Sequence, residues 1–268
     1  MVNRRSPIDS IVATTKGDDG TTGLLFGGDR ISKDDPRTEA YGTIDEAVAA
    51  LGLARANLVV KRRVGTLGPT LGGLGDLILR FQRELFVVGA ELATNPDAWD
   101  RLEDGRTRVS EPMLRDVERV LVEAEASITM PTEFVVPGET PTSAALELAR
   151  TILRRAERRA VGLRREGLVP GAYLVPYLNR LADLIWVLAR AAEQAESRTA
   201  TPARNPAAQA KPPTPARIGG AANATPPTPA RTPAAHATPP TPARIGGAAR
   251  KPTSSRTTAR NHKSGGAT

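Results

Sequence analysis

The sequence predicts an all-α fold, a five-helix up-and-down bundle with an ordered N-terminal loop and a disordered C-terminal tail. Apolar residues recur at helical spacing in five segments between residues 43 and 190. No stretch alternates apolar and polar residues over a length that would form a convincing sheet. The composition changes abruptly near residue 197, and the roughly 190 residues before it suffice for one packed helical core.

The first two helices are predicted on either side of a glycine-rich break. Thr43 and Glu46 have the spacing of a capping box, so the first helix is expected to begin at Thr43 and to run through Leu58. The glycines of residues 65–75 end this helix. The second helix is expected from about residue 76 to residue 93, where leucine, phenylalanine and valine residues share one face.

The other three helices are predicted to begin near Ser110, Thr140 and Gly171. Thr140 is a favourable N-cap, and Pro141 occupies the first helical position, where its missing N–H costs nothing. The fourth helix is expected to end near Gly167, and the fifth to run past Leu188. Between the third and fourth helices, residues 134–138 are interpreted as a short extended segment and turn.

The charge of the chain is unevenly distributed. The 268 residues carry a formal charge of +8, yet residues 197–268 hold 11 of the 37 Lys and Arg residues and no Asp or Glu. The first 196 residues therefore combine the other 26 basic residues with all 29 acidic ones, a net charge of −3. The net positive charge of the whole chain therefore comes from its tail, and it does not indicate a nucleic-acid-binding fold.

The two histidines, His236 and His262, lie in this tail, and the chain has no cysteine. The first 196 residues thus lack the side chains for a Ser/His triad, a cysteine nucleophile or a zinc site. An enzyme built from them must act through Arg, Lys, Asp, Glu, Asn and backbone amides.

The tail contains short repeats. The segment Lys211–Arg217 recurs as Thr225–Arg231 and Thr238–Arg244, and Pro, Ala, Thr and Gly dominate. Such a composition cannot bury enough apolar surface to offset the entropy of ordering. We expect a helical-bundle domain at 1–196 and a disordered basic repeat tail at 197–268, whose removal after Ala195 preserves activity and thermal stability.

Composition also indicates a location. No apolar segment follows Arg4 and Arg5 as in a secretory signal, and no run of about 18 apolar residues occurs. The absence of cysteine fits a reducing compartment. We therefore expect a cytoplasmic protein without a membrane partner.

An arginine-rich helical segment, residues 149–159, is the first candidate for chemistry. Arg150, Arg154, Glu157 and Arg158 share one helical face, opposite an apolar face. Stacked guanidinium groups repel one another, so carboxylates or a polyanionic ligand such as a triphosphate must compensate them, unless the face is simply solvated.

A loop rich in glycine and threonine is the second candidate. Gly17, Gly20 and Gly23 permit positive φ, and consecutive backbone amides in such a loop can bind an anion. Its two carboxylates, Asp18 and Asp19, could bind Mg²⁺ directly or through water. The spacing differs from that of a Walker A loop.

Five ordered blocks carry a family resemblance. They are residues 24–37 followed by 40–46 as one N-terminal block, and then 81–93, 134–138, 149–159 and 177–184. In this order they resemble the PduO-type ATP:cob(I)alamin adenosyltransferases, over about residues 11–193 of the chain. The resemblance implies a ferritin-like, cobalamin adenosyltransferase-like bundle that assembles as a homotrimer with active sites between subunits.

The resemblance also implies the reaction and its participants. The 5′-deoxyadenosyl group of ATP passes to the cobalt of cob(I)alamin, which forms adenosylcobalamin and releases triphosphate. ATP and cob(I)alamin are the substrates, and Mg²⁺ accompanies the triphosphate. A cobalamin reductase and an adenosylcobalamin-dependent enzyme are implied as further partners, without specific binding to nucleic acid.

Residue roles follow from the same resemblance. The residues implied to hold the triphosphate and Mg²⁺ are Thr14, Thr15, Lys16, Gly17, Asp18, Gly20, Thr21, Thr22 and Lys33. The residues implied to lie near ATP and the subunit interface are Arg150, Arg154, Arg155, Glu157, Arg158 and Asn179. Asp45 is implied to pair with Arg150 across the interface, and Phe134 to face the corrin and remove its lower axial ligand.

The residues alone leave other interpretations open. Phe134 could be a core aromatic at a bundle end. Asp45 could instead interact favourably with the positive end of the dipole of a helix that begins at Thr43. Two further functions also remain open: a corrinoid carrier that does not turn over ATP, and an interaction protein tethered by its basic tail. The tail lacks aromatic residues for base stacking, so specific nucleic-acid recognition is not expected.

Overall fold

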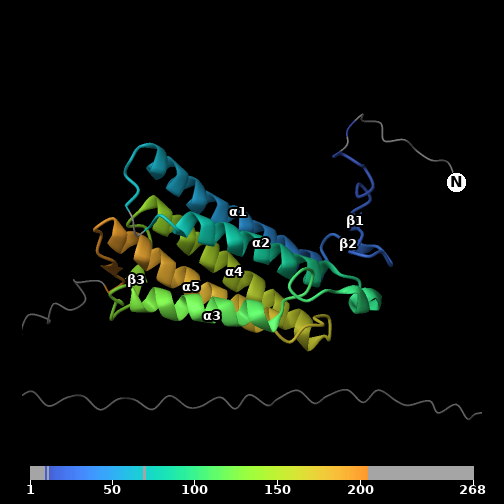
Figure 1. Cartoon of the computed structure of the whole chain (residues 1–268). Helices are drawn as coiled ribbons and strands as arrows, with labels where there is room; N and C mark the ends of the chain where they lie inside the picture. Colours follow the sequence, from blue (N-terminus) through green and yellow to red (C-terminus); the bar gives the residue numbers. More distant parts are fainter. Residues whose placement is uncertain (1–9, 11, 69–70, 205–268) are drawn as a thin grey trace, which may run out of the picture. The chain divides into compact units, whose positions relative to one another are not determined.

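The computed structural model describes residue 10, residues 12–68 and residues 71–204. It confirms the all-α prediction: five long helices form an up-and-down bundle (Figure 1). They are α1 (Pro36–Arg63), α2 (Leu74–Ala93), α3 (Glu111–Ala126), α4 (Pro141–Arg165) and α5 (Leu174–Ala195). Helix α1 packs against α2 and α4, α4 against α5, and α5 against α3. The repeats predicted to be disordered, from Lys211 onward, lie outside the described residues.

The start of α1 differs from the prediction. The helix begins at Pro36, with Asp35 as N-cap, whose carboxylate accepts the Arg37 amide at 2.8 Å. Thr43 lies two turns further on, and its hydroxyl donates to the Glu39 carbonyl at 2.6 Å, so the predicted capping box is wrong. An Asp N-cap followed by Pro at the first helical position is a complete start signal upstream of Thr43. Asp45 therefore lies well inside the helix, away from the positive end of its dipole.

The start of α4 agrees with the prediction. The Thr140 hydroxyl accepts the Ser143 amide at 3.1 Å, and the Ser143 hydroxyl accepts the Thr140 amide at 3.2 Å. This reciprocal pair satisfies two backbone donors that the first turn leaves free. Ser110 occupies the N-cap of α3, but its side chain makes no capping hydrogen bond. A short 3₁₀ helix, η2 (Pro96–Arg101), also forms before α3.

The core is a continuous set of apolar side chains from all five helices. Its largest fully buried aliphatic and aromatic members include Leu51, Ile78, Phe81, Leu85, Leu146, Leu153, Tyr177 and Leu178. The apolar face predicted opposite the arginines of α4 is buried as expected: Ala149, Leu153, Ala156 and Ala160 are each 0% exposed. The arginine-bearing face of α4 is thereby fixed relative to the rest of the bundle.

Two small antiparallel pairs of strands flank the helices. In the N-terminal loop, β1 (Thr21–Thr22) pairs with β2 (Ile31–Ser32), and Leu25 exchanges backbone hydrogen bonds with Ala93 and Asn95 after α2. Beyond the other end of the bundle, β3 (Val135–Val136) pairs with β4 (Thr201–Pro202). The packed region thus extends past residue 196, where the sequence places the start of the tail. Within the described residues, no helix is long and apolar enough to cross a membrane.

Candidate functional site

The N-terminal loop encloses an open cavity of about 580 Å³. The residues that line it are Ala13, Thr14, Thr15, Lys16, Gly17, Asp18, Thr21, Thr22, Gly23, Arg30 and Lys33. This set includes eight of the nine loop residues implicated by sequence, all except Gly20. Three of the side chains are cationic and one is acidic, so the cavity favours a polyanion.

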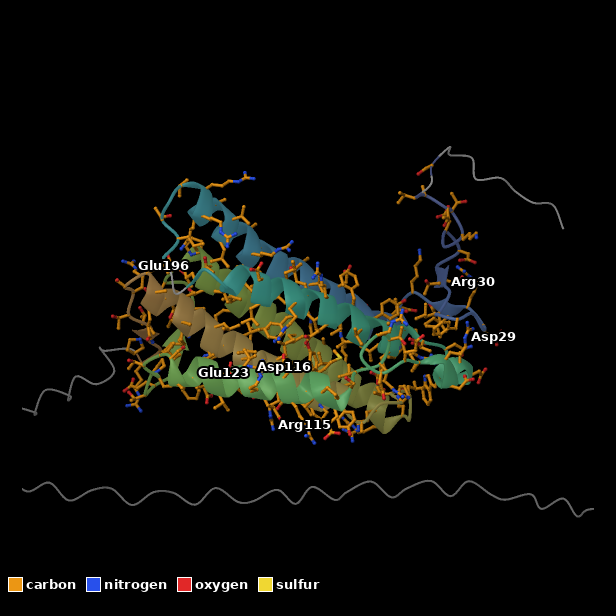
Figure 2. The ribbon with its side chains drawn as sticks, in the orientation of Figure 1. Asp29, Arg30, Arg115, Asp116, Glu123 and Glu196 are labelled. Carbon is orange, nitrogen blue, oxygen red and sulfur yellow. The ribbon has the colours of Figure 1, made fainter. Side chains whose placement is uncertain are left out.

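Arg30 holds this loop together. Its Nε donates to the Thr21 hydroxyl at 2.7 Å, and its Nη2 donates to the carbonyls of Lys16 and Thr21, both at 2.8 Å. Asp29 and Arg30 are both labelled in this loop in Figure 2. The sequence alone does not indicate this role of Arg30, because an arginine that binds backbone carbonyls has no characteristic spacing in the sequence.

The two neighbouring carboxylates of the loop are in different situations. Asp19 accepts the amide and the hydroxyl of Thr21, at 2.9 and 2.8 Å, and these bonds lower the pKa of Asp19. Asp18 is exposed and has no hydrogen-bond or ion-pair partner for its carboxylate among the described residues. The Asp18 carboxylate is therefore available to a cation, whereas the Asp19 carboxylate is engaged in hydrogen bonds to Thr21 that stabilise the loop.

Lys33 closes over the loop backbone. A Cβ placed on Gly17 would lie 2.9 Å from Lys33 Nζ, so the glycine leaves room for the lysine to approach the backbone this closely. The Lys33 amide also donates to the Gly20 carbonyl at 2.9 Å. Of the three glycines expected to permit positive φ, only Gly20 adopts it, with φ of +80°, and Thr15 is the other left-handed residue of the loop, with φ of +55°.

The arginines of α4 divide into two groups. Arg155 forms an ion pair with Glu46, and Arg159 pairs with Glu39 at 2.6 Å, so these two bind α1 within the subunit. Arg154 points away from the core and is exposed, and its side chain has no hydrogen-bond or ion-pair partner among the described residues. Arg150 is partly buried and donates from Nε to Glu147 Oε2 at 2.6 Å.

Two further predicted site residues meet between α4 and α5. The Asn179 Nδ2 donates to Glu157 Oε1 at 3.1 Å, and the Asn179 Oδ1 accepts Arg180 Nη1 at 2.7 Å. Arg158 lies one turn from Arg154 and donates to its carbonyl at 3.2 Å. The Asn179 side chain is therefore oriented by groups on both of its polar atoms.

Phe134 lies directly before β3 and is 90% exposed. Its carbonyl accepts the Ala203 amide at 2.7 Å, which ties its backbone to the segment that includes β4. Phe134 is not a core aromatic within this subunit. Its ring is available as an apolar surface for a flat ligand or for another subunit.

Asp45 lies beside a hollow of about 450 Å³ between α1 and α2. The side chains of Tyr41, Val48 and Phe86 line the same hollow, and Phe86 is 65% exposed. The Asp45 carboxylate has no partner among the described residues. Arg150 is bonded on the α5 side of α4, so the expected pair between Asp45 and Arg150 does not form within one subunit.

The loop cavity and Phe134 lie at opposite ends of the bundle. The loop is anchored beyond the end of α2, near Glu91, which also binds the Gly171 amide before α5 begins. Phe134 instead contacts the chain beyond the end of α5, the end at which Glu196 is labelled in Figure 2. Because α5 has 22 residues, these ends are separated by about 33 Å. One subunit therefore does not bring the loop and Phe134 together.

No group of three or more His, Cys, Asp or Glu side chains within the described ranges is arranged to hold a metal ion. A cation bound at the loop would thus have few protein ligands, of which Asp18 is the available carboxylate.

Comparisons with known proteins identify a family for this chain. The profile of the family described as cobalamin adenosyltransferase matches residues 12–192. A corrinoid adenosyltransferase from Citrobacter freundii is 38% identical over 182 residues, covering 68% of this chain and 94% of that protein. One from Mycobacterium tuberculosis (strain ATCC 25618 / H37Rv) is 36% identical over 188 residues, covering 68% of this chain and 88% of that protein.

The fold is also similar to solved structures. A variant of the PduO-type ATP:corrinoid adenosyltransferase from Lactobacillus reuteri, complexed with cobalamin and ATP, matches with a TM-score of 0.60 and 29% identity. The match covers 72% of this chain and 98% of that one.

Proposed function

The chain belongs to the cobalamin adenosyltransferase family, and from this membership we infer that it is an ATP:corrinoid adenosyltransferase. It transfers the 5′-deoxyadenosyl group of ATP to the cobalt of cob(I)alamin. The cobalt supplies the electron pair that forms the bond to C5′. The C5′–O bond breaks with its electrons going to the triphosphate, which leaves. The nucleophile belongs to the substrate, so the absence of His and Cys from the first 196 residues is no obstacle.

The observation that carries this function beyond family membership is the cationic loop cavity. Lys16, Arg30 and Lys33 line it, together with the backbone of Thr15, which has a positive φ. A triphosphate is a good leaving group only when its negative charge is neutralised. The cationic side chains of the loop supply positive charge where negative charge develops on the leaving triphosphate. We propose that Thr14, Thr15, Thr21 and Thr22 add hydroxyl donors to the same anion.

Mg²⁺ fits this loop as a companion of the triphosphate. Asp18 is an exposed carboxylate without a protein partner among the described residues, and Mg²⁺ typically takes one or two carboxylates together with phosphate and water. The ion would add positive charge at the phosphates. Asp18 is therefore the residue that we propose to hold it.

The separation of the loop from Phe134 supports an active site between subunits. Adenosyl transfer requires that ATP and the corrin meet, yet the loop and Phe134 lie at opposite ends of a bundle whose helix α5 is about 33 Å long. We propose a homotrimer in which the loop of one subunit faces α4 and Phe134 of its neighbour. Asp45 then pairs with Arg150 across the interface, where each has unused hydrogen-bonding capacity.

The remaining roles follow from exposure and orientation. Arg154, exposed and unpaired in the described residues, is proposed to contact ATP directly, with Asn179 held beside it by Glu157. Arg158 lies on the same face of α4 as Arg154 and Glu157. Arg155 lies at the edge of this face, where it pairs with Glu46. Phe134 is proposed to exclude the lower axial ligand, because a four-coordinate cobalt accepts an electron more readily.

The surroundings of the enzyme are also proposals. We place it in the cytoplasm, where ATP is available and where a chain without cysteine needs no oxidising compartment. A cobalamin reductase would supply cob(I)alamin, and an adenosylcobalamin-dependent enzyme would use the product. We propose that the packed domain extends to about residue 204, because β4 pairs with β3 beyond residue 196.

A triphosphate-release assay tests the function. Purified chain, ATP, Mg²⁺ and chemically reduced cobalamin should yield triphosphate and the absorption spectrum of adenosylcobalamin in equal amounts. Omission of cobalamin should abolish the release. Binding of cobalamin without any release of triphosphate would instead identify a corrinoid carrier and overturn the proposal.

A further inference from the structure

Four charged side chains form a cluster between α4 and α5. Glu147 and Arg150 come from successive turns of α4, and Arg190 and Glu193 from successive turns of α5. Glu147, Arg190 and Glu193 are 3%, 1% and 1% exposed. Buried ionised groups are rare unless their charges are compensated, so this cluster requires an explanation.

Arg150 completes the charge balance. The three buried members alone carry one positive and two negative charges, which is unfavourable in the interior. Arg150 adds the second positive charge through its Nε, 2.6 Å from Glu147 Oε2. The other oxygen of the same carboxylate, Glu147 Oε1, lies 3.3 Å from Arg190 Nη2. Glu147 therefore bridges the buried guanidinium of Arg190 and the partly exposed guanidinium of Arg150.

Arg190 also contacts a second carboxylate and an aromatic ring. Its Nη2 donates to Glu193 Oε1 at 2.8 Å, and its Cζ lies 5.5 Å from the centre of the Trp186 ring. Because Arg190 is almost completely buried, Glu147 cannot turn away without leaving a buried positive charge less compensated. The direction of the Glu147 carboxylate is thus determined by the interior of the bundle.

We propose that Glu147, held by Arg190, is a positioning residue for Arg150. An arginine that pairs through Nε keeps both Nη groups for other acceptors. Neither Nη group of Arg150 has a hydrogen-bond partner among the described residues, so this planar fork is presented in one orientation. Its acceptors would be an ATP phosphate or the neighbouring subunit's carboxylate. This inference rests on the proposed function of Arg150.

The competing explanation is that the cluster only fastens α4 to α5. Glu193 distinguishes the two explanations, because it is buried in the same cluster and pairs with Arg190 but makes no contact with Arg150. A fastening role predicts similar consequences for the loss of either carboxylate. A positioning role predicts that only the loss of Glu147 alters the use of ATP.

Steady-state kinetics of the full chain, with ATP and reduced cobalamin, test the proposal. We expect Glu147→Gln to lower kcat/KM for ATP about 10- to 100-fold, because a small displacement of a binding group has effects of this size. The matched control Glu193→Gln should remain within about threefold of wild type. Thermal unfolding of both variants establishes that they are folded to the same extent.

A double-mutant cycle with Arg150→Ala gives the decisive measurement. If Glu147 acts through Arg150, Glu147→Gln should add less than about twofold in that background. Equal effects of the two carboxylate variants, or full additivity with Arg150→Ala, would overturn the positioning role alone. If Glu147→Gln does not fold, Glu147→Asp replaces it, since it keeps the charge but withdraws it from Arg150. A wild-type chain without turnover overturns the proposed function and this role together.

Discussion

Glu91 Oε1 accepts the backbone amide of Gly171 at 3.0 Å, and the other oxygen of the same carboxylate accepts the Val109 amide at 2.7 Å. Glu91 is 1% exposed and belongs to α2, so one buried carboxylate fastens the segments that precede α3 and α5. A Cβ on Gly171 would lie 2.2 Å from Glu91 Oε1, which explains the glycine at this position. The same end of the bundle anchors the N-terminal loop.

Glu91 should make stability depend on pH. Burial, opposed by the two amide hydrogen bonds, raises the pKa of Glu91 from 4.5 to about 6. Between these values the folded chain binds more protons than the unfolded chain, so this contribution is complete below pH 4.5 and is lost as pH rises through about 6. A pKa raised by about 1.5 corresponds to about 2 kcal/mol.

Denaturant unfolding of wild type and Glu91→Gln at pH 4.5, 5.5 and 7 checks this prediction. The difference in free energy of unfolding between wild type and Glu91→Gln should change by about 2 kcal/mol over this range. Wild type should be relatively more stable at pH 4.5 than at pH 7. The control Glu125→Gln removes an exposed carboxylate of α3 and should give a nearly constant difference. Parallel pH profiles for wild type and Glu91→Gln would contradict the assignment.

Arg154→Ala should abolish most turnover and leave the bundle folded. The side chain is exposed and makes no contact with the core, so its loss should change stability little. Loss of one charge-assisted contact to a desolvated phosphate should cost about 2–4 kcal/mol, or about 30- to 1,000-fold in rate. Triphosphate release and circular dichroism measure the two effects.

Arg164→Ala is the matched control for this variant. Arg164 lies on the last turn of the same helix, is exposed, and its side chain has no partner among the described residues. We expect its activity to stay near wild type. Comparable losses in both variants would indicate a general effect of charge on α4 and not a contact of Arg154 with ATP.

The position at which the tail is removed should decide whether Phe134 remains ordered. A chain ending at Arg204 keeps β4, the Ala203 hydrogen bond to Phe134 and the bond from Thr201 to Glu139 at 2.5 Å. A chain ending at Glu196 loses all of them, so these contacts replace the expectation from composition that removal after Ala195 preserves thermal stability. We expect the longer chain to match the full protein, and the shorter one to have a lower Tm by about 2–4 °C and weaker cobalamin binding. Equal Tm and cobalamin affinity for the two chains would show that β4 does not support Phe134.

The sequence predicts those helices whose start signals agree with one another. At Thr140, the N-cap, the proline at the first position and the apolar spacing all indicate the same boundary, and α4 begins there. At Thr43, the capping-box spacing conflicts with the stronger signal of Asp35 and Pro36, and the prediction is wrong by two turns. Local patterns are therefore reliable where several of them coincide.

Contacts between distant segments could not be predicted in the same way. The pairing of β3 with β4 joins residues more than 60 positions apart, and Pro202 in β4 would argue against a strand. The cluster of Glu147, Arg190 and Glu193 has the charge pattern of an ordinary solvated face, yet it is buried because α4 and α5 pack there. Residue types indicated the candidate site, whereas the packing of helices determines which of its charges meet.

Asp45 tests the proposed interface most directly. Its place well inside α1 excludes a helix-dipole role, because that effect is confined to the first turn. The carboxylate is exposed beside an apolar hollow that includes Phe86, and its proposed partner Arg150 pairs with Glu147 within the chain. Asp45→Asn keeps the shape of the side chain and removes its charge.

We expect this variant to weaken ATP binding and turnover together and to loosen the trimer. If the pair is buried at the interface, removal of the Asp45 charge leaves the Nη groups of Arg150 buried without their acceptor, at a cost of about 3–5 kcal/mol. Calorimetry with ATP, triphosphate release and sedimentation velocity measure the three effects, with Glu125→Gln as an exposed-carboxylate control. An Asp45→Asn trimer with unchanged kinetics and ATP affinity would refute the intersubunit pair, because a charge that contributes to neither assembly nor binding cannot be the partner of Arg150.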